Sequence, residues 1–168
     1  GFPGLLRLLG FLEFLGFIRG MKVHIFPTPA DLGNSAGSAA AKFVRKAITE
    51  KGACNIILAT GTSQFATLKK LTSEQVDWSK VVMFHLDEYI GLPITHPASF
   101  RKYLKERFIS IVPSLKAAHL INGETDPGQE CERLGRLIKA HPIDVALVGV
   151  GENGHLAFND PPADFETE

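Results

Sequence analysis

The chain has 168 residues, a length that suits one domain with a buried hydrophobic core. Its 18 basic and 18 acidic side chains cancel, so no net field is available to hold a nucleic acid or an anionic membrane surface, and we expect neither partner. Cys54 lies in an apolar stretch, and Cys131 lies on the apolar side of an expected helix. Both positions are typical of inert buried thiols, which argues against a disulfide framework or a zinc site.

Residues 1–20 follow a three-residue repeat in which a glycine or a charged residue precedes two mostly apolar ones. This period drifts against the helical period of about 3.6, so no fixed apolar face forms. Arg7, Glu13 and the glycines also interrupt the apolar stretch that a membrane span or a signal peptide needs. We interpret residues 1–20 as a low-complexity extension outside the fold, with Met21 as the natural start; membrane targeting is the weaker alternative.

Strands and helices alternate from Met21 onward. The alternation of apolar and polar residues over 21–26 predicts a strand. Thr28 with Pro29 and Asp31 predicts the start of a helix, and Gly52 its end. The apolar stripe of this helix is expected to pack on a sheet and comprises Leu32, Ala36, Ala39, Ala40, Phe43, Val44 and Ile48.

Further strands are expected at residues 55–59, 81–86 and 143–148. Helices are expected near Gln64, after Pro97, and from Asp126 to Pro142; the apolar side of the last helix would be Cys131, Leu134, Leu137 and Ile138. Such alternation implies right-handed crossovers. Residues 21–168 are therefore expected to form a three-layer α/β/α domain with a mostly parallel, Rossmann-like sheet.

The segment 143–160, IDVALVGVGENGHLAFND, predicts a strand that opens into a glycine-rich loop. His155 and Asp160 would then lie at the carboxyl end of the sheet, where parallel α/β sheets bind ligands. An imidazole titrates near neutrality, and Asp160 could orient it or stabilise its cation. The alternative is an ordinary hydrogen-bonded loop histidine, which is our interpretation of His24, His85, His96, His119 and His141.

Gly149, Gly151 and Gly154 have the G-x-G-x-x-G spacing of dinucleotide-binding loops. That fingerprint also requires a helix that begins inside the motif, whereas Pro161 and Pro162 block a long helix here. The glycines are more simply explained by a tight turn, or by close approach of the backbone to a small substrate.

The segment Thr60-Gly61-Thr62-Ser63 lies between an expected strand and an expected helix. Amides at a helix start with hydroxyls beside them suit a phosphate dianion, and the alternative is an ordinary capping turn. No Gly-Lys-Ser/Thr ending is present, so a nucleoside triphosphate is not implied.

Asp87 and Glu88 follow the expected strand 81–86. Neighbouring side chains point in opposite directions on extended backbone, so only one carboxylate should enter a cleft. Shielded from water, it could take a proton from a carbon next to a carbonyl or imine. The alternative is a solvated acidic turn.

Together these segments resemble the glucosamine-6-phosphate deaminase family, which is related to the 6-phosphogluconolactonases. The most specific motifs are LATG at 58–61, LDEYIGLP at 86–93, and GVG with NGH and AFN between 149 and 159. The resemblance implies conversion of glucosamine 6-phosphate to fructose 6-phosphate and ammonia in amino-sugar catabolism, by a cytoplasmic enzyme without metal or organic cofactor. A homo-oligomer is left open.

The resemblance also assigns roles to residues. Asp87 would move a proton from C2 toward C1, His155 would help to open the sugar ring, and Asn153 with Asp160 would support His155. The remaining candidates would bind the substrate and its phosphate: Thr60, Gly61, Thr62, Ser63, Gly151 and Gly154.

The chain departs from the family pattern in several respects. Residues 61–63 are Gly, Thr and Ser where many members have two glycines and a threonine. Position 160 is Asp where Glu is usual, and family members continue well past residue 168, so we expect residues 21–168 to be an incomplete domain whose own activity is open. Two alternatives remain: a 6-phosphogluconolactonase-like hydrolase, in which His155 would activate water, and a sugar-phosphate sensor without turnover. The sequence after His155, Leu-Ala-Phe-Asn-Asp, favours the deaminase over the lactonase.

Overall fold

The computed structural model describes residues 22–151 and 153–155, so the predicted extension 1–20 and Asp160 lie outside the described residues. Residues 22–26 follow no strand pattern, and Val23 and Ile25 are exposed. The elements that follow are α2 (Pro29–Lys51), β1 (Cys54–Leu58), η1 (Thr62–Gln64), α3 (Phe65–Ser73), η2 (Trp78–Lys80), β2 (Val81–His85), α4 (Phe100–Leu104), the π-helical turn η3 (Lys105–Ile109), β3 (Ala117–His119), α5 (Pro127–Ala140) and β4 (Val145–Leu147).

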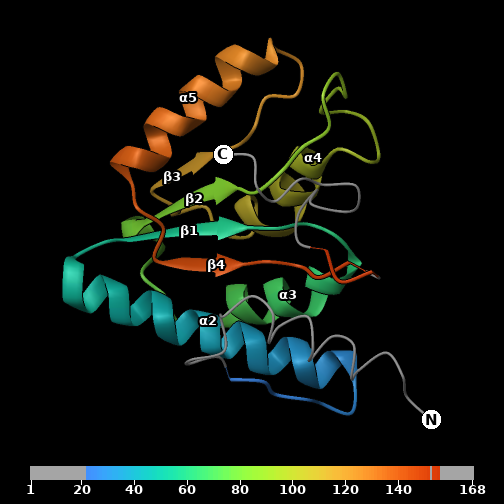
Figure 1. The fold of residues 1–168 in the computed structure, drawn as a ribbon. Helices are drawn as coiled ribbons and strands as arrows, with labels where there is room; N and C mark the ends of the chain where they lie inside the picture. Colours follow the sequence, from blue (N-terminus) through green and yellow to red (C-terminus); the bar gives the residue numbers. More distant parts are fainter. Residues whose placement is uncertain (1–21, 152, 156–168) are drawn as a thin grey trace.

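The described strands form a four-stranded parallel sheet in the order β3-β2-β1-β4. Figure 1 shows the strands running in one direction, with α2 and α3 on one side and α5 on the other. Met83 belongs to the core beneath α2, α3 and α4, whereas its neighbour Phe84 contacts His141, which follows α5. The predicted α/β class with a parallel sheet and flanking helices is confirmed.

The main hydrophobic core lies between the sheet and the helices α2, α3 and α4. The strands contribute alternate side chains to this face, and the helices contribute their apolar sides. The large core side chains that are almost completely excluded from solvent are Val44, Ile56, Leu58, Leu68, Leu71, Val81, Met83, Leu104 and Phe108.

Helix α2 begins and ends as predicted, but only part of its predicted apolar stripe is buried. The hydroxyl of Thr28 accepts a hydrogen bond from the Asp31 amide at 3.1 Å, and Gly52 closes the helix with a φ of 76°. Ala40 and Val44 are buried as predicted, whereas Leu32 and Phe43 are 50% and 58% exposed. The buried face is rotated toward two glycines and comprises Gly33, Gly37, Ala40, Ala41, Val44 and Ala47.

The two glycines explain this rotation of α2. A Cβ atom on Gly33 would lie 2.2 Å from the Cβ of Ala66, and one on Gly37 would lie 2.7 Å from the Cβ of Lys70. Because only a residue without a side chain permits such an approach, α3 packs against the glycine ridge and the larger apolar side chains turn outward.

The prediction of a strand at residues 21–26 is wrong for the described residues 22–26. A strand exists only where a neighbour completes its hydrogen-bond ladder, and no described strand pairs with this segment. Conversely, β3 was not predicted, because Ala117, Ala118 and His119 carry little strand propensity. These residues are held by pairing with Val82, Met83 and Phe84.

Helix α5 begins as predicted, with the Asp126 side chain accepting a hydrogen bond from the Gln129 amide at 2.9 Å. The prediction that Cys131 is buried is wrong, since this thiol is exposed. Glu130 is the buried residue instead, because its carboxylate accepts a hydrogen bond from the Asn122 amide at 2.7 Å and pairs with Arg133. These polar contacts fix the rotation of the first turn of α5. Cys54 is buried as predicted.

Candidate functional site at the carboxyl edge of the sheet

The predicted site segments follow three adjacent strands at the same level. Leu58 of β1 is in register with His85 of β2 and with Leu147 of β4. Thr60, Asp87 and Gly149 each come two residues after these partners. Because the strands are parallel, the three segments leave the same edge of the sheet, as the sequence predicted.

The segment 60–63 forms a turn that leads through η1 into α3. Gly61 has a φ of 105° and a ψ of 166°, a conformation open essentially only to glycine. Its carbonyl oxygen accepts hydrogen bonds from the Gln64 amide at 3.1 Å and from the Tyr103 hydroxyl at 2.9 Å. Thr62 and Ser63 are exposed beside the start of the helix. The amides and hydroxyls of this turn are thus available to an anion.

The segment 149–155 is a compact loop built around His155. The Gly151 amide donates to the His155 carbonyl at 2.8 Å, and the Gly154 amide donates to the Gly151 carbonyl at 2.9 Å. Gly154 has a φ of 88°, which suits glycine. A Cβ atom on Gly151 would lie 2.2 Å from Cε1 of His155, so the imidazole lies directly over this glycine.

The side chain of Asn153 holds that of His155. The Asn153 Oδ1 atom pairs with Nδ1 of His155 and accepts a hydrogen bond from the His155 amide at 3.3 Å. Since an amide oxygen can only accept, this pairing places a proton on Nδ1, and in the neutral ring Nε2 is then the atom with the free lone pair. Asp160, the other residue predicted to support His155, lies outside the described residues.

The glycine loop after β4 approaches the turn after β1. A Cβ atom on Gly149 would lie 3.5 Å from Nε2 of Gln64 and 3.6 Å from Oγ of Ser63. Two candidate segments that are far apart in the sequence are therefore neighbours in space.

The side chains of Asp87 and Glu88 differ in burial, as the alternation of side chains along extended backbone predicts. Glu88 points into the protein, where its side chain is 0% exposed and pairs with Arg101. The Asp87 side chain is half-buried and makes no hydrogen bond or ion pair within the described residues. Burial, and then the neighbouring charge of Glu88, raise the pKa of Asp87. Such a carboxyl group holds a proton more readily than a solvated aspartate.

Several residues at this edge were not identified from the sequence. Tyr103 reaches the turn after β1 from α4, and the guanidinium of Arg107 lies 3.8 Å from the centre of the Phe65 ring at the start of α3. Arg101 partners Glu88. The sequence indicated Tyr103 only as part of the apolar spacing of a helix after Pro97 and gave no role to Arg101 or Arg107. The signal that could have identified Arg101 is that a buried carboxylate requires a cationic or hydrogen-bonding partner.

His85 was interpreted as an ordinary loop histidine, and this is wrong. It is the last residue of β2 and is 2% exposed. Its Nδ1 atom faces the Ile121 amide at 3.5 Å, and Nε2 has no hydrogen-bond partner among the residues that the structure describes. Burial lowers the pKa of His85 to about 4, so the ring is neutral at physiological pH. His85 is buried because it belongs to the same strand as the apolar residues Val81 to Phe84, and every residue of this strand is buried.

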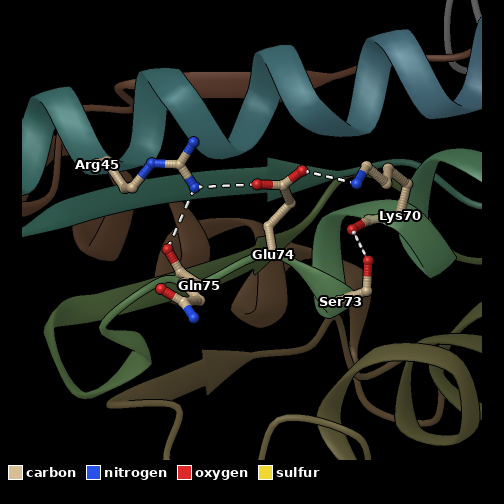
Figure 2. A pocket seen from close by; sticks show the side chains of 5 residues that line it. All are labelled: Arg45, Lys70, Ser73, Glu74 and Gln75. Carbon is tan, nitrogen blue, oxygen red and sulfur yellow. Dashed lines mark hydrogen bonds and ion pairs between the residues drawn. The ribbon is translucent and has the colours of Figure 1, made fainter.

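A hollow of about 430 Å³ among the described residues lies away from this edge. Figure 2 shows it beside α2 and the end of α3, with Arg45, Lys70 and Glu74 among its lining residues. The Glu74 carboxylate pairs with Arg45 at 3.2 Å and with Lys70 at 2.9 Å. Both cations of the lining are therefore already paired with the same carboxylate, and nothing else in the lining points to a bound anion.

Within residues 22–151 and 153–155, no three His, Cys, Asp or Glu side chains are grouped so that they could hold a metal ion. Among the described helices, none has both the length and the apolar character that a bilayer span requires.

Comparison with known proteins gives one consistent family. Residues 27–162 match the family described as glucosamine-6-phosphate isomerases/6-phosphogluconolactonase. A glucosamine-6-phosphate deaminase of Lactobacillus delbrueckii subsp. bulgaricus is 32% identical over 148 residues, which cover 88% of this chain and 61% of that protein. The chain thus spans about three fifths of the length of this relative.

Solved structures agree on the fold. A monomeric glucosamine-6-phosphate deaminase superposes with a TM-score of 0.74 at 28% identity, covering 88% of this chain and 62% of that one. A 6-phosphogluconolactonase from Shewanella baltica superposes with a TM-score of 0.72 at 21% identity, covering 81% and 59% of the two chains. The chain belongs to the family of glucosamine-6-phosphate isomerases and 6-phosphogluconolactonases.

Proposed function

We propose that this protein converts glucosamine 6-phosphate and water to fructose 6-phosphate and ammonia, as a cytoplasmic enzyme of amino-sugar catabolism. The observation that carries the proposal is the common level of Thr60, Asp87 and Gly149 at one edge of the sheet. This edge brings together an anion-binding turn, a partly buried carboxylate and a loop that presents an imidazole. Its supporting evidence is family membership and the deaminase relatives.

His155 acts first, in opening of the sugar ring. With Nδ1 protonated toward Asn153, Nε2 accepts the proton of the anomeric hydroxyl and returns it to the ring oxygen as the C1–O5 bond breaks. The resulting imidazolium is transient, and Asn153 and Asp160 serve to orient and stabilise it. The product is the open-chain amino aldehyde.

Asp87 then moves the proton that isomerises the open chain. Its carboxylate removes the proton from C2, the electron pair shifts toward the C1 carbonyl, and O1 takes a proton from the ammonium group of the substrate, which gives an enolamine. The protonated Asp87 returns the proton to C1, which leaves an imine at C2. Water adds to that imine and ammonia departs, so that fructose 6-phosphate remains. The raised pKa of Asp87 suits a group that must both take and return a proton.

The turn 60–63 holds the phosphate in this proposal. The amides at the start of η1, with the hydroxyls of Thr62 and Ser63, supply donors for a dianion, and Gly61, Gly151 and Gly154 let the backbone come close to the sugar phosphate. No cofactor and no macromolecular partner take part in this scheme, and a homo-oligomer remains open.

The test uses the protein expressed from its complete reading frame. We expect it to release ammonia and fructose 6-phosphate from glucosamine 6-phosphate, and we expect Asp87→Asn and His155→Gln to lose this turnover. Asp77→Asn and His24→Gln, at exposed positions, are the matched controls and should keep it.

Two outcomes would replace this proposal. Hydrolysis of 6-phosphogluconolactone without ammonia release would establish the lactonase alternative, in which His155 activates water for attack on the ester carbonyl. Binding of the sugar phosphate without any turnover would establish the sensor alternative. Each assay uses the same protein preparation, so the three functions are separated directly.

A further inference from the structure

The backbone on either side of Asp87 is anchored by two independent contacts. On one side the Leu86 amide donates to the Leu58 carbonyl of β1 at 3.1 Å. On the other side Glu88 is fixed in the interior. Within the described residues its carboxylate accepts five hydrogen bonds, from the amides of Tyr89, Phe100 and Arg101, the Ser99 hydroxyl and Nε of Arg101.

These contacts add to the capping of α4, whose N-cap residue is Ser99. The amides of Phe100 and Arg101 belong to the first turn of this helix, where backbone donors have no partner inside the helix. They donate to Glu88 at 3.1 and 2.8 Å. Burial would raise the pKa of Glu88, but the hydrogen bonds from Arg101, Tyr89, Phe100 and Ser99 hold it below its usual range. Glu88 therefore remains an anion beside Asp87.

Arg101 ties this anion to two more segments. Its side chain is 7% exposed and donates from Nη2 to the Leu92 carbonyl at 2.7 Å and from Nη1 to Oδ1 of Asn122 at 2.9 Å. Glu124 pairs with the same guanidinium at 2.9 Å. The loop after β2, the start of α4 and the segment after β3 are thus joined at one point.

Resting on the proposed function, we propose that the buried Glu88–Arg101 pair is a positioning device that sets the direction of the Asp87 carboxylate. Since adjacent side chains of extended backbone face opposite ways, holding Glu88 inward turns Asp87 toward the carboxyl edge of the sheet. Glu88 and Arg101 touch no reacting atom in this scheme. They are positioning residues, and they act through Asp87.

The pair also sets the charge that Asp87 experiences. The titratable and charged groups that bear on the pair in the described residues are Glu88 and Arg101 themselves, His85 beneath them, and Glu124 and Glu130 on the Arg101 side. Of these groups, Glu88 acts on Asp87, and it raises the Asp87 pKa. Removing the Glu88 charge should therefore lower that pKa.

The first variant is Glu88→Gln, with Glu132→Gln as control because Glu132 forms an exposed ion pair with Arg136 on α5. We expect kcat for glucosamine 6-phosphate to fall by roughly 10- to 100-fold as Asp87 loses its alignment. KM should change little, and the acidic limb of the kcat/KM profile should move to lower pH. The control should show none of these effects.

The second variant is Arg101→Lys, which keeps a cation and the carboxylate of Glu88 but cannot reach Leu92 and Asn122 together. We expect kcat to fall while the acidic limb stays in place, because the charge beside Asp87 is retained. If both variants lower only the thermal midpoint and leave kcat per folded molecule and the pH profile unchanged, the pair is merely structural and the inference is overturned.

A readout without turnover separates this inference from the proposed function. The chemical shift of the Asp87 carboxyl carbon, assigned with Asp87→Asn, reports its titration in the wild type and in Glu88→Gln. A downward shift of the Asp87 pKa in the variant supports the inference even if the wild type fails to deaminate the sugar, whereas an unchanged pKa overturns it. Absence of turnover in the wild type counts against the proposed function alone.

Discussion

The Tyr103 hydroxyl donates a hydrogen bond of 2.9 Å to the carbonyl of Gly61 and so links α4 to the turn after β1. The Tyr103 ring also stacks on Phe65, with centroids 5.7 Å apart, at the start of α3. The carbonyl of Gly61 also accepts a hydrogen bond from the Gln64 amide at 3.1 Å. These bonds fix the turn in which Thr62 and Ser63 are exposed, and the amides and hydroxyls of these two residues are the donors that we propose for the phosphate.

Tyr103→Phe should weaken binding of the sugar phosphate while it preserves the stacked ring. Loss of one hydrogen bond of ordinary strength corresponds to a rise in KM of about two- to tenfold. We expect kcat to remain close to that of the wild type, because Asp87 and His155 are untouched. Steady-state kinetics with glucosamine 6-phosphate provide the measurement. An unchanged KM would show that this bond does not shape the phosphate turn.

Asp87→Asn should abolish turnover and raise stability at neutral pH. A carboxyl group whose folded pKa is raised contributes stability at low pH and loses that contribution as the pH rises through its folded pKa. Ionised Asp87 is therefore destabilising at neutral pH, and the amide removes this cost. Thermal unfolding at pH 7 should show a higher midpoint for the variant, and the difference should vanish below pH of about 4.

Asp77 is the control for this prediction, because the pKa of its carboxyl group is shifted in the opposite direction. A hydrogen bond from Ser79 lowers the pKa of the exposed Asp77 carboxyl, so its ionised form is favoured in the folded state. Asp77→Asn should leave the midpoint equal or lower at pH 7. If the thermal midpoint of Asp87→Asn also falls at pH 7, the prediction is wrong, and the ionised Asp87 carboxylate is stabilised in the folded protein.

Gly33→Ala should destabilise the protein, because its methyl group would meet Ala66 at 2.2 Å. Forcing α2 and α3 apart is expected to cost about 1–3 kcal/mol in the free energy of unfolding, measured with urea. Gly135→Ala in α5 is the control, since a Cβ atom there meets nothing within 4 Å. That change should stabilise by about 0.5–1 kcal/mol through helix propensity. Equal effects would refute the packing argument.

His85 should make the protein sensitive to acid. A histidine whose folded pKa is lowered to about 4 contributes stability above its ordinary pKa of 6.5 and loses it as the pH falls through 4. The full effect is on the order of 3 kcal/mol. His85→Gln should flatten the fall in unfolding free energy between these two pH values, whereas His24→Gln at an exposed position should not. An unaltered slope in His85→Gln would assign the acid sensitivity to other groups.

Helix ends were predictable because their causes are local. Thr28 and Asp126 cap α2 and α5 through contacts with residues three positions away, and Gly52 ends α2 in a conformation that suits glycine. The rotation of each helix was not predictable. The buried face of α2 depends on the approach of α3 to Gly33, and that of α5 on the contact between Glu130 and the Asn122 amide.

The same distinction between local and distant causes applies to the candidate site. That Asp87 and the loop containing His155 follow apolar strands could be read directly, because a strand end and a glycine-rich turn are local signals. That Glu88 is buried against Arg101, that His85 is neutral in the interior and that Tyr103 holds Gly61 could not. Each of these depends on a partner from another element.

The sequence by itself determined the alternation of strands and helices, the helix caps, and which residues stand at strand ends, since all of these follow from the conformational preferences of neighbouring residues. Only the tertiary structure decided that β1 lies between β2 and β4, and with it that Thr60, Asp87 and Gly149 share one level. The physical reason is that hydrogen-bond register and close packing join residues far apart in the chain, and no local preference encodes those distances.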